Sequence, residues 1–154
     1  MPAPIRIRHA TVADAKQLLH LWTMVYSGDD STSQAWGQHA EEWFAQVVED
    51  RAKAHFPVII VDSNVVATAI GTLELGVPNP CSVTGRSVRL ANVVTMPEHR
   101  RRGYGTLLVR SVVEWAREIA ADRVDLSATP DGQRIYEKAG FEMTNAPRMK
   151  LSLR

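Results

Sequence analysis

The sequence predicts an α/β domain in which amphipathic helices pack against a central sheet. Segments rich in β-branched residues alternate along the chain with segments whose apolar residues recur at helical spacing. Two strand-like segments, 57–61 and 65–73, flank Asp62-Ser63-Asn64, which is typical of a hairpin turn. A third, 88–95, leads through a turn into a glycine-containing run and then an amphipathic helix. With 154 residues, the chain has the length of one typical domain, so we expect a single domain over residues 1–154.

The N-terminal part predicts a short strand and two helices. The strand covers residues 5–8, and Thr11 and Asp14 then have the spacing of a capping box, with Asp in place of the usual Glu or Gln. The apolar face of the first helix contains Ala15, Leu18, Trp22 and Val25. We expect a loop over the polar residues 27–33 and a second helix over 35–52.

The C-terminal part predicts a long helix, a strand, a short helix and a last strand. The long helix begins near Tyr104, and its apolar face contains Leu108, Val112, Trp115 and Ile119. A strand follows over 124–127, then a helix over 131–139 that Gly140 closes. Residues 149–153 complete the prediction as a strand.

The run Arg100-Arg101-Arg102-Gly103-Tyr104-Gly105-Thr106 predicts a pyrophosphate-binding loop. Gly103 and Gly105 lack the β-carbons that would keep a ligand from the backbone. The first turn of the following helix has unpaired N–H groups and a partial positive charge, which favour an anion. No Lys-Ser/Thr pair follows Gly105, and Leu108 stands where a dinucleotide fingerprint needs its third glycine. A P-loop and a Rossmann site are therefore excluded.

Two motifs resemble the GNAT superfamily of N-acetyltransferases. Arg100-x-x-Gly103-x-Gly105 is similar to its acetyl-CoA-binding signature, and the run Ile135-Tyr136-Glu137-Lys138-Ala139-Gly140-Phe141 is similar to a second family mark. The resemblance is strong over residues 57 to 151 and implies a mixed, mostly antiparallel sheet flanked by helices. It also implies acetyl-CoA as cosubstrate and direct transfer of an acetyl group to a primary amine of a small molecule or peptide.

The resemblance assigns cofactor-binding residues along this part of the chain. The pantetheine arm is expected to pair with the backbone of Val93, Val94 and Thr95, as an added strand would. The pyrophosphate is expected to bind the segment made of Arg100, Arg101, Arg102, Gly103, Tyr104, Gly105 and Thr106.

The resemblance also implies that Tyr136 is the acid that protonates the departing CoA sulfur. The alternative is a buried tyrosine whose hydroxyl has a structural partner. Some relatives carry a basic carboxylate early in the strand before the loop, but here no Asp or Glu occurs between Glu74 and Glu98. Glu74 alternates with apolar neighbours and is a candidate base or water-positioning residue, although its position also suits plain solvent exposure. His99 is a weaker candidate.

Other reactive residues favour structural explanations. Cys81 has no sequence feature that pairs it with a histidine, so we expect a loop thiol. His39 and Glu42 lie one helical turn apart, but two ligands do not make a metal site, and no metal is expected. Trp36 and Trp43 have the spacing of a core-facing helical stripe, and lining an acceptor pocket is the alternative.

Composition limits the partners and the setting. Lys and Arg number 18 against 17 Asp and Glu, for a net charge of +1, so nucleic acid is not the expected partner. A single cysteine cannot form an internal disulfide, and the N-terminus lacks a long apolar stretch, so we expect a cytoplasmic protein without membrane attachment. Many relatives are dimers, which leaves a homodimer open. A non-catalytic acyl-CoA sensor is the alternative to an enzyme.

Overall fold

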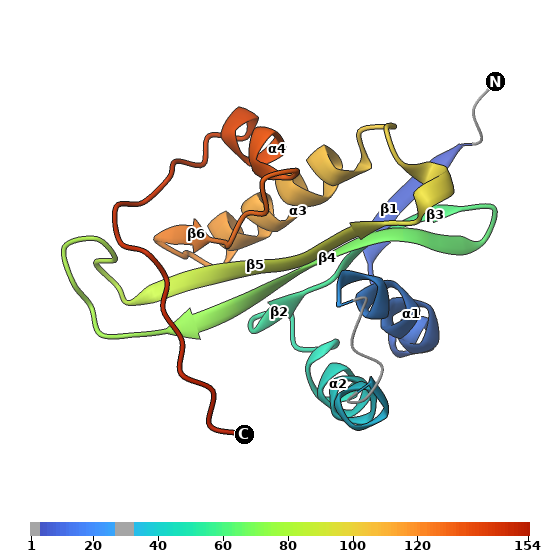
Figure 1. Cartoon of the computed structure of the whole chain (residues 1–154), viewed down its shortest axis with the longest axis horizontal. Helices are drawn as coiled ribbons and strands as arrows, with labels where there is room; N and C mark the ends of the chain where they lie inside the picture. The colour runs from blue at the N-terminus through green and yellow to red at the C-terminus, as the bar shows by residue number, and fades with distance from the viewer. Residues whose placement is uncertain (1–3, 27–32) are drawn as a thin grey trace.

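A computed structural model describes residues 4–26 and 33–154 as one sheet with helices on both faces (Figure 1). The strands run in the order β1-β3-β4-β5-β6, and β2 pairs with β4 outside this path. Neighbouring strands are antiparallel except for β5 and β6, which are parallel. The mixed, mostly antiparallel sheet flanked by helices is therefore confirmed. The strands are β1 Ile5–His9, β2 Ala54–His55, β3 Pro57–Val61, β4 Asn64–Leu75, β5 Arg86–Thr95 and β6 Arg123–Asp125.

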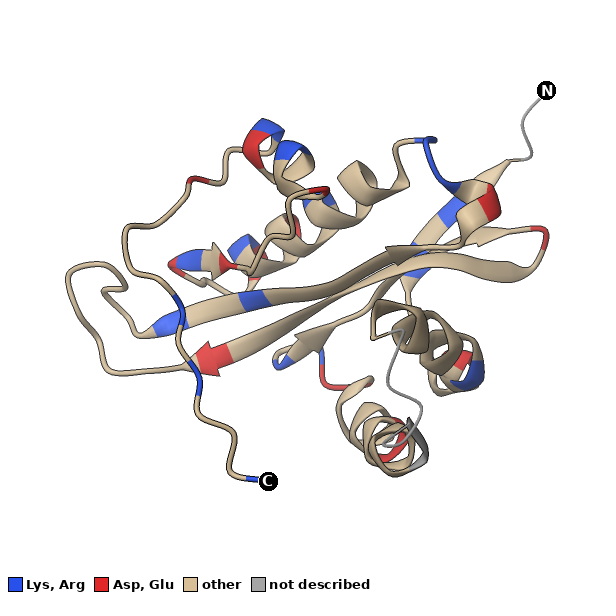
Figure 2. Cartoon of the chain, viewed as in Figure 1, with Lys and Arg blue, Asp and Glu red and all other residues tan. Residues whose placement is uncertain are grey.

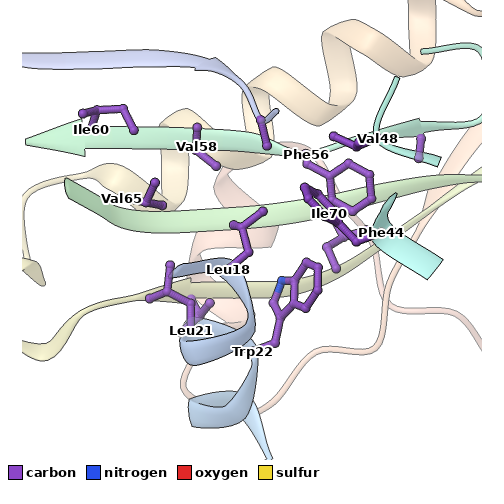
Figure 3. Close-up of a cluster of buried hydrophobic side chains, with 13 residues drawn as sticks. Leu18, Leu21, Trp22, Phe44, Val48, Phe56, Val58, Ile60, Val65 and Ile70 are labelled. Carbon is purple, nitrogen blue, oxygen red and sulfur yellow. The ribbon is translucent and has the colours of Figure 1, made fainter. Parts of the chain in front are cut away.

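The helices divide between the two faces of the sheet, and each face has its own core. On one face lie α1 (Ala15–Val25) and α2 (Ser33–Val47), and on the other lie α3 (Tyr104–Glu118) and α4 (Gln133–Lys138) (Figure 1). The first core gathers side chains of α1, α2 and the strands β2, β3, β4 and β5 around Phe56, and Figure 3 shows this cluster. The second is formed largely by α3 against β3, β4 and β5.

The capping box at the start of the first helix is confirmed. The Thr11 backbone N–H donates to the Asp14 carboxylate at 2.8 Å, and the short helix η1 (Val12–Asp14) then continues into α1. Arg8 of β1 pairs with the same carboxylate at 2.8 Å. Burial alone would raise the pKa of Asp14, but these hydrogen bonds outweigh it and hold the pKa below its ordinary value. The carboxylate therefore ties β1 to the first turn of the helix.

The predicted hairpin forms between β3 and β4, with a tighter turn than expected. Val61 pairs with Asn64, so that only Asp62 and Ser63 make the turn, with φ of 48° and 66°. Two consecutive left-handed residues are typical of the hairpin turns whose twist matches that of the strands.

Several predicted boundaries differ in the structure; the strand predicted over 124–127, for example, is β6 at Arg123–Asp125. The second helix ends at Val47 instead of 52, because turns around Asp50 bring Ala54 and His55 alongside β4 as β2. The fourth helix is shorter than predicted, at Gln133–Lys138. The predicted loop over 27–33 lies outside the described residues except for Ser33, which begins α2.

The prediction of a last strand over 149–153 is wrong for this structure. No strand is assigned there, and Met149, Leu151 and Leu153 are 89%, 85% and 88% exposed. The alternation of apolar residues has strand character, but a strand also needs a partner, and β6 pairs only with β5. The C-terminal segment instead crosses in front of β4 and β5 in the view of Figure 1. Within residues 4–26 and 33–154, no helix is long and apolar enough to cross a membrane.

Candidate functional site

A bulge interrupts β5 in the middle of the sheet. Ala91 pairs with Ile70 and Val94 pairs with Thr68, so Asn92 and Val93 together face the single residue between them on β4. Asn92 has φ of 50°, in the left-handed region that asparagine tolerates better than most residues. A bulge bends its strand and leaves one residue outside the ladder, so the regular pairing of β5 with β4 is interrupted at Asn92 and Val93.

Beside the bulge, β5 and β6 separate. Their parallel pairing ends where Arg89 of β5 meets Asp125 of β6, and the rest of β5 up to Thr95 has no partner on β6. The predicted pantetheine-binding residues Val93, Val94 and Thr95 therefore lie along an open strand edge. Arg100 Nε donates to the Thr95 carbonyl at 3.2 Å, which fixes the turn leaving this edge.

The predicted pyrophosphate loop directly follows the open edge and precedes α3. Arg101 has φ of 64° and Gly103 has φ of 80°, so left-handed residues alternate with ordinary ones and turn backbone N–H groups toward one side, as in an anion-binding nest. Arg100, Arg101 and Arg102 are exposed, and Figure 2 shows the basic stretch before α3. A β-carbon on Gly103 would meet nothing within 4 Å, so the space above it is open to a ligand.

The remaining loop residues differ in what they offer a ligand. Tyr104 is buried in the α3-side core, which leaves only its backbone available. Gly105 faces α4 instead of solvent, because a β-carbon there would lie 3.4 Å from Ile135 Cδ1. Thr106 is exposed on the first turn of α3.

Tyr136 lies on α4 at the wall of a cavity of about 360 Å³ between β6, α4 and residues 141–148. Its ring packs edge-on against Phe141, with centroids 6.0 Å apart. Burial raises the pKa of Tyr136 above its ordinary value, so the hydroxyl is protonated at neutral pH. The described residues give this hydroxyl no hydrogen-bond partner, unlike a structural tyrosine with a satisfied hydroxyl.

The structure does not bring the candidate bases to the bulge. Glu74 is exposed and pairs with Ser87, which precedes Asn92 by about 17 Å along β5 at about 3.3 Å per residue. His99 lies in the turn after β5 and lines a different cavity, together with α1 and the β3–β4 turn. Its Nδ1 is buried without a partner among the described atoms.

Tyr26 lies on the α1 and α2 side of the bulge and was not predicted as a site residue. Tyr26, which ends α1, donates its hydroxyl to Asn92 Oδ1 at 2.9 Å. Its ring meets Trp36 of α2 edge-on at 5.6 Å. Tyr26 and Asn92 are 66 positions apart, so no local pattern could have paired them. Trp36 is partly buried against the first core, and Trp43 packs on Trp22 and Phe56.

The other reactive residues are not part of the site. Cys81 is a free, exposed loop thiol, as predicted. His39 and Glu42 are exposed on α2. No group of three or more potential metal ligands occurs in the part of the chain that the structure describes.

Comparison with known proteins identifies the fold around this site. A family model described as "Acetyltransferase (GNAT) family" matches residues 16–141. An uncharacterized N-acetyltransferase of Bacillus subtilis, YobR, is 34% identical over 77 residues, which cover 48% of this chain and 28% of that protein. The chain thus matches little more than a quarter of this relative's length.

Solved structures share the same architecture. A GCN5-related N-acetyltransferase from Ralstonia eutropha superposes with a TM-score of 0.84 at 18% identity, covering 96% of this chain and 99% of the other. A predicted acetyltransferase from Clostridium acetobutylicum, solved with acetyl-CoA, has a TM-score of 0.82 at 20% identity and 97% coverage of both chains. The family model spans most of the sequence and the fold agrees with it. The chain belongs to the acetyltransferase (GNAT) family, which confirms the resemblance.

Proposed function

We propose that the chain transfers the acetyl group of acetyl-CoA directly to a primary amine of a small molecule or peptide. The observation that carries this proposal is the continuous surface made by the open edge of β5 and the left-handed loop at the start of α3. A thioester arm fits the first and its pyrophosphate fits the second. The acetyl-CoA complex of the Clostridium relative, which has the same fold, supports acetyl-CoA as the cosubstrate.

The binding residues divide by chemistry. Val93, Val94 and Thr95 offer backbone groups to the pantetheine amides, at the place where the β5–β6 pairing has ended. Gly103 lets the phosphate approach the backbone, and the exposed guanidinium groups of Arg100, Arg101 and Arg102 supply positive charge. No metal takes part in this proposal.

The reaction joins nitrogen to the acetyl carbon and breaks the bond from that carbon to sulfur. An ordinary alkyl ammonium with pKa near 10.4 is about 0.1% neutral at pH 7, so attack needs the acceptor to lose a proton. The acceptor nitrogen loses its second proton as the amide forms, and the CoA sulfur gains one. We assign the donor for sulfur to Tyr136, whose raised pKa keeps it protonated beside the β5–β6 opening.

The candidate base Glu74 does not lie next to the bulge. Glu74 is about 17 Å away along the strand, so any role for it runs through bound water. The distance of this candidate base from the bulge favours the second candidate function, a sensor that binds acyl-CoA without turnover.

A thiol-release assay separates the two functions. Acetyl-CoA is mixed with a panel of amines that contains polyamines, amino sugars, amino acids and peptides, and free CoA is followed together with the acetylated product. The proposal expects amine-dependent release with one acetyl group on the product. Calorimetric binding of acetyl-CoA without release for any amine would favour the sensor instead, and no binding would contradict both.

A further inference from the structure

Two guanidinium groups converge on one serine at the end of the β5–β6 pairing. Arg89 of β5 donates from Nη2 to Ser127 Oγ at 2.8 Å, and Arg148 donates from Nη1 to the same oxygen at 3.3 Å. The two donor nitrogens are therefore at most about 6 Å apart. A carboxylate or phosphate can accept hydrogen bonds from two guanidinium groups at such a separation.

Asp125, Glu137 and Glu142 line the same cavity as Arg148, but within the described residues no carboxylate forms an ion pair with Arg89 or Arg148. The ion pairs found there are Arg8–Asp14, Lys53–Asp50 and Arg123–Asp125, so the nearby Asp125 is already engaged. Glu74 lies on the same face of the sheet but pairs with Ser87, one diagonal step from Arg89, and forms no ion pair with it. Ser127 supplies a neutral hydroxyl only. Two like charges held together without an anion favour an anionic ligand.

The pair faces the acceptor side of the site. Val88 and Leu90, which flank Arg89, are both buried in the core under α3, so Arg89 lies on the opposite face with α1 and α2. The bulge residue Asn92 and its partner Tyr26 lie on this same face, which α1 and α2 cover. Ser127 and Arg148 line the cavity that Tyr136 also lines. Arg148 therefore shares a cavity with the predicted acid, and Arg89 lies on the same face of the sheet as Tyr26.

The pair is separate from the charges assigned to CoA. Arg89 precedes Thr95 by about 20 Å along β5 at about 3.3 Å per residue, and the loop of Arg100, Arg101 and Arg102 begins beyond Thr95. A pyrophosphate held at the start of α3 would not reach Arg89 and Arg148. The two guanidinium groups are therefore available to an anionic group of the other substrate.

We propose that Arg89 and Arg148 bind an acidic group on the acceptor, so that the substrate is an amine that also carries a carboxylate or a phosphate. This inference rests on the proposed acetyltransferase function and narrows its acceptor. Ser127 holds the two side chains in place before the acceptor arrives, which reduces the entropy lost on binding. Tyr26 and Trp36 contact the body of the acceptor between its acidic group and its amine.

Matched acceptors test the inference in the wild-type enzyme. One pair is an amino acid and its amide, and the other is an amino sugar and its phosphate ester, each measured by thiol release at saturating acetyl-CoA. The inference expects kcat/KM at least tenfold higher for the acidic member of one pair. The pair that shows the preference distinguishes a carboxylate from a phosphate.

Two variants and a control tie the preference to the arginines. In Arg89→Gln and in Arg148→Gln the acidic-over-neutral preference should fall at least tenfold through KM of the acceptor, whereas KM of acetyl-CoA should stay the same. Arg110→Gln removes an exposed charge on α3 and should keep the full preference. Equal turnover of acidic and neutral acceptors, or a preference that survives both Arg89→Gln and Arg148→Gln, would overturn the inference and leave the proposed function standing. No amine turnover at all would overturn the proposed function itself.

Discussion

Gly103 gives the sharpest test of the CoA-binding loop. The change is Gly103→Ala, at a residue with φ of 80° whose added β-carbon would touch no protein atom within 4 Å. Inside the protein, the substitution therefore costs only the left-handed backbone strain of a non-glycine residue, about 1–2 kcal/mol. For a chain of this length, that strain lowers Tm by about 2–8 °C.

The ligand would be affected differently, because the new methyl group fills the space through which a phosphate reaches the loop. One lost charge-assisted hydrogen bond is worth about 1.5–3 kcal/mol, which corresponds to an affinity loss of roughly 10- to 150-fold. Titration calorimetry with CoA measures this loss, and thermal unfolding measures the strain.

Gly140→Ala is the matched control. Gly140 also has a left-handed φ, of 99°, and a β-carbon there would also meet nothing within 4 Å. The control should lose similar stability and keep CoA affinity. Wild-type CoA affinity in a folded Gly103→Ala protein would refute the assignment of this loop to the pyrophosphate.

Three further predictions concern the acid, the charges and a buried histidine pair. Tyr136→Phe should lower kcat by about 10²–10⁴-fold and spare CoA affinity, and the basic limb of the wild-type rate profile should lie above pH 10, because burial raises the pKa of Tyr136. Unchanged turnover, with chemistry limiting, would make Tyr136 a packing residue. The affinity for CoA should fall as the salt concentration rises, and it should fall less steeply in a variant in which Arg100, Arg101 and Arg102 are all Gln. An equal salt dependence in the two proteins would show that these arginines do not bind the phosphates. Burial, with His9 and Arg51 nearby, lowers the pKa of His55 to about 4 from 6.5, so the unfolded chain takes up the proton first. The free energy of unfolding should then fall by up to ~3 kcal/mol as the pH drops from 6.5 to about 4. Chemical denaturation at several pH values measures this fall, and a His55→Gln variant whose free energy of unfolding falls equally with pH would contradict the prediction.

The histidine prediction rests on a buried polar chain through the sheet. His9 and His55 approach Nδ1 to Nδ1 at 3.3 Å, and their outer nitrogens contact the Val48 carbonyl at 2.6 Å and Ser111 Oγ at 2.9 Å. His55 also stacks on Trp115 at 5.7 Å. Only one proton can lie between the two facing nitrogens, so a second proton would break the chain.

The sequence predicted the parts of the fold that local chemistry decides. The capping box of Thr11 and Asp14 and the hairpin around Asp62 and Ser63 depend on residues close in the chain, and both are present. The glycine loop before α3 likewise follows from its own residues. The exposed segment 149–153 shows the limit, because its alternation has strand character and a strand still needs a neighbour.

Of the proposed site, only the CoA side could be predicted from the sequence. The backbone there is specified by a short motif, whereas the acceptor side is assembled from distant segments. Tyr26 meets Asn92 across 66 positions, and Arg89 and Arg148 meet only through Ser127. The bulge at Asn92 depends on the register between β4 and β5, which no single segment encodes.

Hydrogen exchange of backbone amides with and without CoA tests the central claim most directly. If the open edge of β5 and the loop before α3 both bind the same CoA molecule, CoA should slow amide exchange in residues 92–95 and 103–106. Residues 71–75 of β4, which lie away from both, should exchange at the same rate in either state. Unchanged exchange rates in residues 92–95 and 103–106, with CoA shown to be bound, would contradict the proposed cofactor site.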